Sequence, residues 1–366
     1  MKVLSINTAS KKYNIYIGHN TIVQLNSIIK KEKITFYKSL IIVDKKVPKT
    51  FIRKINSQIN SKKKLIYYFN SSEKNKNLNS INIILEKLFK NNFTRGDVII
   101  CVGGGIAGDV SAFAASIYKR GIKFINIPST LLSQVDSSIG GKTGVNTKFG
   151  KNLIGTFYQP ELVISDINFL KTLSQRELIC GYGEILKHSL IANKYFFNYL
   201  NRYFSNIINL KSPFIEKSIY ESCKIKKMIV EKDERENNLR KVLNFGHTFA
   251  HAYEAALNYS KKLNHGEAVL LGINSAIKFS DKKKLLKKSD YITIKKYFES
   301  SKLPTDIKKY FSLNDLNKII SFMIKDKKNS SEDINLILLK KIGKPLIDQR
   351  YKKQQLKKFL RKELSN

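Results

Sequence analysis

One stretch of the sequence joins an apolar run to a cluster of glycines: DVIICVGGGIAGD, residues 97–109. The apolar run at 97–102 predicts a buried β-strand, and residues 110–115 after the glycines predict a helix. Glycine lets the backbone approach a ligand closely, and the first turn of a helix presents N–H groups that can bind a phosphate. We therefore predict a strand–turn–helix unit with a pyrophosphate site at its turn.

This turn matches the glycine spacing of dinucleotide-binding motifs, G-x-G-x-x-G. The acid that usually binds the ribose about 20 residues further on is absent, because that position falls near Ile127 and Pro128. An acid does end an earlier apolar run, at Asp44. The alternative is a tight turn without a ligand, but its place between a strand and a helix favours the phosphate site.

The segments around this turn predict an α/β domain followed by a helical one. Apolar runs at 40–44, 64–69 and 123–128 predict further strands, and residues 79–89 have helical spacing. Strands separated by helix-length segments indicate a parallel sheet. From about residue 173 the pattern becomes helical, at 176–192, 213–232, 246–257, 266–281 and in the Lys-rich tail from 351. We predict an α/β domain at 1–172 and an all-α domain at 173–366.

The composition is that of a folded, two-domain chain. It has 366 residues, of which 42% are hydrophobic. No run approaches the roughly 20 apolar residues that span a bilayer, and the first residues do not resemble a signal peptide. The three cysteines are far apart in the sequence and form no recognisable disulfide or zinc pattern. We expect a cytoplasmic protein without a membrane partner.

The strong positive charge allows two interpretations. The net charge is +38 and the pI about 9.9, which in isolation would favour nucleic-acid binding. However, the lysines are scattered through the chain, and Asn and Ile are abundant as well, which is typical of A+T-rich codon usage. No nucleic-acid-binding motif accompanies the charge. We therefore expect no specific nucleic-acid partner, only adhesion to polyanions at low salt.

A polar loop and a set of histidines are the remaining candidates for chemistry. Residues 128–146 are rich in hydroxyls and glycines, and Lys142 and, shortly after, Lys151 and Asn152 sit among small residues. A lysine held there can bind a phosphate or carboxylate as a point charge. An ordinary surface loop is the alternative, although a loop this long is more often functional.

Five histidines occur in the chain, and three of them cluster late in the sequence. His247 and His251 lie one helical turn apart, His265 precedes the next helix, and Glu184 offers a carboxylate. Two imidazoles and a carboxylate make a catalytic zinc set. The spacing favours His247 and His251 as the ligand pair, but it leaves open that His251 instead supports the ligands. Each histidine alone could also be an ordinary polar residue.

Together these segments resemble the 3-dehydroquinate synthase family from residue 44 to residue 343. The most specific matches are 104–109, 136–146, 181–187, 233–234, 239–240, 243–248 and 265–269. The resemblance implies an α/β NAD-binding domain and a helical metal-binding domain with the active site in the cleft. It also implies that Glu184, His247 and His265 bind the metal, zinc or cobalt, which leaves His251 to contact substrate or support the ligands.

The resemblance implies roles for further residues. The implied NAD contacts are Asp44, Glu73, Lys76, Gly105, Ile106, Ala107, Gly108, Asp109, Ser129, Thr130, Lys142, Lys151, Phe169, Leu170, Lys171 and Thr172. The implied substrate contacts are Asp136, Lys142, Asn152, Lys187, Lys226, Arg240, Asn244 and His251. Arg120 is expected to reach the neighbouring site in a homodimer, and Lys327 or Lys328 to close over substrate. Two segments depart from the family pattern: Ser72 replaces a glycine before Glu73, and residues 329–331 lack the usual glycine.

The implied reaction converts 3-deoxy-D-arabino-heptulosonate 7-phosphate into 3-dehydroquinate and phosphate in the shikimate pathway. A ring hydroxyl is oxidised transiently with NAD, phosphate is eliminated, the ketone is reduced again, and the ring opens and closes by an aldol step. Two related activities are the alternatives. A polyol or glycerol dehydrogenase needs no phosphate clamp, and the residues that argue against it are Lys142, Lys187, Lys226 and Arg240. A sugar-phosphate cyclase of aminocyclitol biosynthesis binds no substrate carboxylate, so Arg240 is the discriminating residue.

Overall fold

The computed structural model describes residues 1–325 and 333–365, and its internal contacts divide the chain into two compact units. Unit 1 comprises Met1–Leu178 and Ile219–Arg235, and unit 2 comprises Ile179–Ser218 and Glu236–Asn366. Unit 1 is therefore discontinuous in sequence, because residues 219–235 pack with the N-terminal region. A functional division between residues 172 and 173 stays a prediction.

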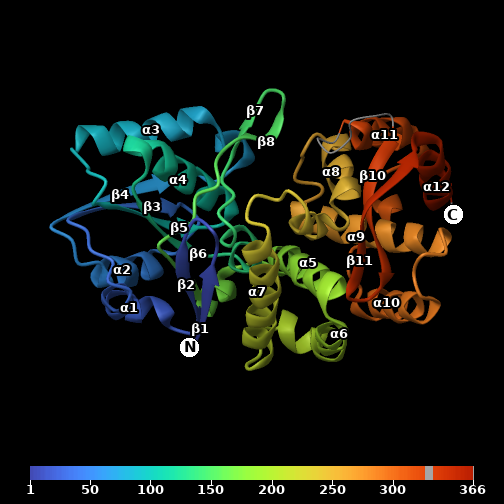
Figure 1. The fold of residues 1–366 in the computed structure, drawn as a ribbon, viewed down its shortest axis with the longest axis horizontal. Helices are drawn as coiled ribbons and strands as arrows, with labels where there is room; N and C mark the ends of the chain where they lie inside the picture. Colours follow the sequence, from blue (N-terminus) through green and yellow to red (C-terminus); the bar gives the residue numbers. More distant parts are fainter. Residues whose placement is uncertain (326–332, 366) are drawn as a thin grey trace. The chain divides into compact units, whose positions relative to one another are not determined.

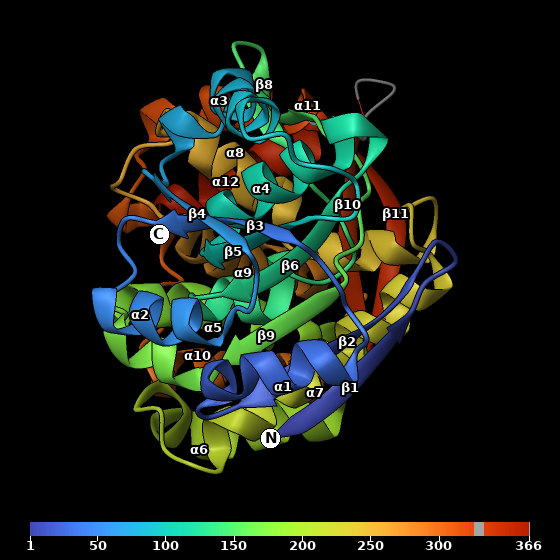
Figure 2. The same cartoon turned by 90° about the vertical axis from the view of Figure 1, so that its left-hand side faces the viewer.

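Within the described residues, unit 1 is built on a seven-stranded sheet in the order β1-β2-β9-β6-β5-β3-β4 (Figures 1 and 2). β1 and β2 are antiparallel, and the other neighbouring strands are parallel. The strands are β1 Lys2–Asn7, β2 Lys12–Gly18, β3 Lys38–Asp44, β4 Lys63–Phe69, β5 Val98–Gly103, β6 Lys123–Pro128 and β9 Leu162–Asp166. The four predicted strands are β3 to β6. The unpredicted ones lack a long apolar run, since β1 and β2 mix polar with apolar residues and β9 has only five residues.

Helices cover both faces of this sheet (Figures 1 and 2). These helices are α1 Leu25–Lys31, α2 Lys49–Gln58, α3 Leu78–Lys90 and α4 Gly105–Ile117. Successive side chains of a strand point to opposite faces. In β3, Ile41 and Val43 pack in the core formed with α1 and α2, whereas Leu40 and Ile42 pack in the core formed with α3 and α4. Burial on both faces explains why this strand is apolar throughout.

The predicted strand–turn–helix unit is present as β5, the glycine turn and α4. The region predicted as a long loop after β6 contains a π-helical turn, η4 Ser133–Ser137, and a small antiparallel hairpin, β7 Val145–Thr147 with β8 Gly150–Ile154. Short 3-10 helices complete the unit: η1 Thr21–Gln24, η2 Glu73–Asn75, η3 Tyr118–Arg120 and η5 Ile167–Thr172.

Unit 2 is mainly helical, as predicted. Its elements are α5 Gln175–Ala192, whose first turn lies in unit 1, α6 Lys194–Ile208, η6 Leu239–Asn244, α8 His247–Ala256, α9 His265–Lys282, α10 Lys288–Ser301, η7 Ile307–Lys309, η8 Leu313–Asp315, α11 Leu316–Ile324 and α12 Lys353–Ser365. The helix α7 Phe214–Lys232 begins in unit 2, but most of its residues belong to unit 1. An antiparallel hairpin, β10 Asp333–Lys341 with β11 Lys344–Lys352, corrects the expectation of an all-α region. β10 alternates between buried and half-buried positions, the period of a strand. In residues 1–325 and 333–365, no helix has the length and apolar character needed to cross a membrane.

Candidate functional site

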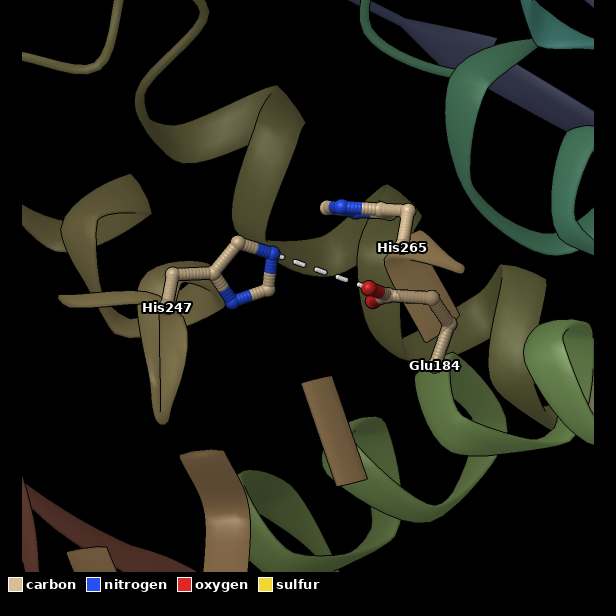
Figure 3. Close-up of side chains that lie close together, drawn as sticks. All are labelled: Glu184, His247 and His265. Atoms are coloured by element: carbon tan, nitrogen blue, oxygen red, sulfur yellow. Dashed lines mark ion pairs between the residues drawn. The ribbon is translucent and has the colours of Figure 1, made fainter. Parts of the chain in front are cut away.

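Three side chains from separate helices of unit 2 converge on one point (Figure 3). They are Glu184 of α5, His247 of α8 and His265 of α9, and one ligand atom from each lies within 4.8 Å of the others. His247 Nε2 lies 3.6 Å from Glu184 Oε1, and the two imidazole centroids are 5.8 Å apart. Two imidazoles and a carboxylate form the donor set of a catalytic zinc site that leaves a further position open.

The surroundings of Glu184 test whether a cation fits this point. The carboxylate is fully buried, and among the described residues its Oε1 accepts no hydrogen bond. The ammonium of Lys187, one turn further along α5 and also buried, makes an ion pair with Glu184 Oε2. A buried carboxylate is costly unless charges and donors surround it. A divalent cation between Glu184 and the imidazoles would provide that compensation, so the residues fit a metal.

A close helix contact brings His265 to Glu184. His265 is the first residue of α9 and is followed by Gly266. A Cβ on Gly266 would lie 2.2 Å from the carbonyl oxygen of Cys180, which is one turn before Glu184 on α5. Any side chain larger than hydrogen at Gly266 would therefore push the two helices apart and separate the two ligands.

A second glycine sets the start of α8 and the direction of His247. Gly246 has a φ of 80°, and a Cβ there would lie 2.7 Å from the backbone nitrogen of Ile273 on α9. The Nδ1 of His247 lies 3.3 Å from the carbonyl oxygen of Phe245, so it is positioned to donate a hydrogen bond to that oxygen. This contact leaves the Nε2 of His247 on the side of Glu184.

His251 lies beside the cluster without joining it. Its ring centroid is 5.4 Å from that of His247 and 6.4 Å from that of His265, and its side chain is exposed. The three-residue ligand group contains His265 and not His251. The helical spacing of His247 and His251 is real, but it concerns one helix, whereas the third ligand comes from another.

Glu254 is a contact that sequence reasoning missed. It is buried, lies on α8, and its Oε2 is 3.0 Å from the Nδ1 of His265. The signal was present, because His247, His251 and Glu254 stand at helical spacings of four and three residues and so share one face.

Two further predicted residues of unit 2 lie on η6, just before α8. Arg240 is buried at 2% exposure, and Asn244 donates a hydrogen bond to Glu236 Oε1 at 2.5 Å. A buried guanidinium is a strong candidate for binding an anion, since it keeps its charge.

Two predicted cofactor residues and one predicted substrate contact of unit 1 form a charged cluster around Lys76. The Lys76 ammonium donates to Asp109 Oδ2 at 2.5 Å and to Asn152 Oδ1 at 2.6 Å, and its side chain is only 8% exposed. Burial raises the pKa of the Asp109 carboxyl, and the nearby Lys76 offsets only part of that rise. Three residues that are far apart in sequence are thus brought together.

A neighbouring, more exposed group centres on Glu73. Lys151 Nζ lies 3.2 Å from Glu73 Oε1, and Asn146 Nδ2 donates to Glu73 Oε2 at 2.8 Å. Burial alone would raise the pKa of Glu73, but Lys151, Asn146 and Lys76 together outweigh burial and lower it.

The remaining predicted contacts of unit 1 are near the glycine turn or in the segments that follow β6. Asp44 ends β3 and Ser129 and Thr130 follow β6, and both strands flank β5. Because parallel strands end at the same edge, these residues lie on the side of the glycine turn. Residues 105–109, which include the predicted Gly105, Ile106, Ala107 and Gly108, form the first turns of α4. A small cavity is lined by Gly108, Asp109 and Lys142.

Two predicted substrate contacts pair with each other. Lys226 of α7 donates to both the carboxylate and the carbonyl of Asp136 at 2.5 Å.

The predicted NAD contacts on η5 differ in exposure. Phe169 and Leu170 are fully buried, and Phe169 stacks on Phe51. Lys171 and Thr172 have exposed side chains.

Arg120, at the end of η3, is exposed. Lys327 and Lys328 lie outside the described residues.

Comparison with known proteins places the whole chain in one family. Residues 66–180 match the family model of the 3-dehydroquinate synthase N-terminal domain, and residues 181–329 match that of its C-terminal domain. A 3-dehydroquinate synthase from Pelagibacter ubique (strain HTCC1062) is 55% identical over 99% of this chain and 98% of the relative. The chain belongs to the 3-dehydroquinate synthase family. Its activity is accordingly that of a 3-dehydroquinate synthase, a lyase that eliminates phosphate.

Solved structures share the 3-dehydroquinate synthase fold. A 2-deoxy-scyllo-inosose synthase complexed with carbaglucose-6-phosphate, NAD+ and Co2+ superposes with a TM-score of 0.88 at 26% identity, covering 99% of this chain and 100% of that one. A 2-epi-5-epi-valiolone synthase from Streptomyces hygroscopicus with NAD+ and Zn2+ bound gives 0.84 at 21% identity, covering 100% and 99%. The second likeness shows the fold alone. Sequence identity, not fold, separates 3-dehydroquinate synthases from these other synthases.

Proposed function

We propose that the chain converts 3-deoxy-D-arabino-heptulosonate 7-phosphate into 3-dehydroquinate and phosphate with NAD and one divalent metal ion, zinc or cobalt. The observation that carries this proposal is the convergence of Glu184, His247 and His265 in a member of this family. When bound, the metal supplies Lewis-acid polarisation of a substrate hydroxyl, and NAD takes up a hydride and returns it.

In this proposal the three ligands neutralise part of the charge of the metal ion and fix the direction from which it contacts substrate. Glu184 brings the negative charge, and the two imidazoles bring neutral donors on rigid helices. The Lys187 ammonium, which now pairs with Glu184, would turn toward substrate once a cation replaces it. His251, exposed beside the cluster, is suited to hold or move a proton at the hydroxyl that is oxidised.

The substrate carries a phosphate and a carboxylate, and we assign separate cations to its two ends. Arg240 offers a planar donor fork that suits a carboxylate, whereas the lysines act as point charges for phosphate. The proposed lysines are Lys142, Lys187 and Lys226, with Asp136, Asn152 and Asn244 as polar partners. Holding both ends in one orientation would contribute much of the rate enhancement.

NAD is assigned to the residues around the glycine turn. The first turn of α4 can bind the pyrophosphate through its backbone N–H groups, and Asp44 stands at the end of β3 where a ribose would be reached. Lys76, Asp109, Glu73 and Lys151 already form one charged region of unit 1. Related synthases described with bound NAD+ and Co2+ or Zn2+ support both cofactors.

The location and the assembly remain proposals. The three cysteines are buried thiols, which suits a reducing cytoplasm. A homodimer, to which Arg120 would contribute across the interface, is expected from the family resemblance, and light scattering of the purified protein would test it.

The deciding experiment measures phosphate release from the heptulosonate phosphate with NAD far below the substrate concentration. We expect many turnovers per NAD, because oxidation and re-reduction cancel within one cycle. NADH accumulating in step with product would contradict the proposal and favour the dehydrogenase. The same assay with glucose 6-phosphate is the control, and faster turnover of that sugar would favour an aminocyclitol cyclase.

A further inference from the structure

The two proposed histidine ligands are held by different kinds of acceptor. His247 Nδ1 faces a backbone carbonyl, that of Phe245, at 3.3 Å. His265 Nδ1 faces a carboxylate, that of Glu254, at 3.0 Å. Glu254 is 4% exposed and therefore lies in the interior beside the ligand cluster.

The chemistry of this contact fixes which nitrogen of His265 can bind a cation. A neutral imidazole has one N–H and one lone pair, and an ionised carboxylate only accepts hydrogen bonds. The N–H of His265 is therefore on Nδ1, and the lone pair is on Nε2 at the opposite side of the ring. A carboxylate behind a histidine ligand also raises the basicity of that ligand.

The packing of α8 against α9 places Glu254 of α8 next to His265 of α9. His247 begins α8, and Glu254 follows seven residues later on the same face. One helix thus provides a ligand of its own and the acceptor that orients a ligand on the next helix. His265 itself is partly exposed, with 37% of its side chain accessible, so this contact restrains a ring that packing alone does not enclose.

We infer that Glu254 is a positioning residue of the metal centre, which selects the Nδ1–H form of His265 and aims its Nε2 at the ion. The inference rests on the proposed metal site. Loss of such a supporting carboxylate typically weakens metal affinity by about 10- to 100-fold. Its effect should appear in metal binding itself, whether or not substrate is present.

The experiment measures Co2+ affinity of the full-length protein by competition with a chelator, together with the visible absorption of bound Co2+. Glu254→Ala removes the acceptor and should weaken binding by about 10- to 100-fold and change the Co2+ spectrum. Glu254→Gln keeps an amide oxygen that can still accept from Nδ1–H. It should recover much of the affinity and a spectrum close to that of the unaltered protein.

Asp290→Asn is the matched control. Asp290 is another buried carboxylate of unit 2, which accepts from Lys194 Nζ at 2.7 Å and from the Ile342 backbone at 3.0 Å. This variant should keep the Co2+ affinity even if its thermal stability falls. Equal weakening by Asp290→Asn and Glu254→Ala would overturn the inference, because burial of charge would then explain both.

His265→Ala separates failure of the inference from failure of the proposed site. If His265→Ala loses Co2+ while Glu254→Ala keeps full affinity, the inference alone is wrong. If His265→Ala also keeps full affinity, the metal assignment fails and the inference fails with it. Only weakening in both, with Asp290→Asn unchanged, supports the positioning role.

Discussion

The charged cluster of unit 1 and the ligand cluster of unit 2 are built in opposite ways. Around Lys76, opposite charges and complementary hydrogen-bonding groups meet, with the ammonium donating to Asp109 and Asn152. Around Glu184, three groups that can all act as acceptors face one point, within 4.8 Å of one another. The members of the first cluster attract one another, whereas the three acceptor groups of the second do not stabilise one another.

This difference decides how much each cluster says about a ligand. Ion pairs are common in proteins without any ligand, so the Lys76 cluster is compatible with a cofactor site but does not require one. Converging acceptors must be held by the backbone around them, here by close helix contacts at Gly246 and Gly266. A structure that brings acceptors together in this way leaves a cation as the natural complement.

Removing one acceptor from the unit 2 cluster should have the largest effect. We expect His265→Ala to lose bound metal and to lower kcat/KM by about ten-thousandfold, since metal polarisation is worth several kcal/mol at about 1.4 kcal/mol per decade. Metal content by atomic spectroscopy and phosphate release would measure both. Glu184→Gln should behave in the same way.

His251→Ala is the control for this prediction, since His251 lies beside the cluster outside the ligand group. It should keep the metal and slow catalysis only. If His251→Ala lost the metal while His265→Ala kept it, His251 and not His265 would be the ligand. The comparison between the two clusters would then no longer hold.

The next largest effect is expected at Arg240, the buried cation of unit 2. Losing a charge-assisted hydrogen bond to a buried anion costs about 2–5 kcal/mol. Arg240→Lys should therefore lower kcat/KM by about 30-fold to several thousandfold. Metal content and NAD affinity should not change. A change in metal content or NAD affinity would show that Arg240 stabilises the metal or NAD site and does not bind substrate alone.

Lys76→Met tests whether the unit 1 cluster is more than an internal ion pair. Loss of hydrogen bonds from a charged group costs about 1.5–3 kcal/mol, so NAD affinity in calorimetry should fall by about 10- to 100-fold. Lys90→Met is the matched control, because Lys90 lies outside the proposed NAD site, its partner Glu86 is 64% exposed, and such pairs contribute about 0–1 kcal/mol. Unchanged NAD affinity in Lys76→Met would leave the cluster with a purely structural role.

The smallest effect is expected on the C-terminal helix α12. Lys358 and Lys362 are exposed there, and burial together with these lysines lowers the pKa of Lys282. Lys358→Gln with Lys362→Gln should raise that pKa and change turnover by no more than about twofold, as is usual for surface positions. A loss comparable to that of Arg240→Lys would show that the positive charge has a role in the reaction.

The local elements of this protein could be predicted from the sequence, because each depends on neighbouring residues. The apolar run and glycines at 97–109 predict β5, the turn and α4, which the structure contains. Three of the five histidines of the chain lie close together in the sequence, which also indicated a metal-binding region. The hairpin β10–β11 and the strands β1 and β2 were missed, because their patterns are mixed or interrupted.

Only the tertiary structure decided which side chains meet. Spacing along one helix favours His247 with His251, whereas packing of α9 against α5 at Gly266 brings His265 to Glu184 instead. The contact of Glu254 with His265 and the return of residues 219–235 to unit 1 are likewise invisible in local patterns. Helical periodicity relates residues a few positions apart, but a ligand set assembled from three helices depends on how closely their backbones can approach, and steric contact sets that distance only in the folded chain.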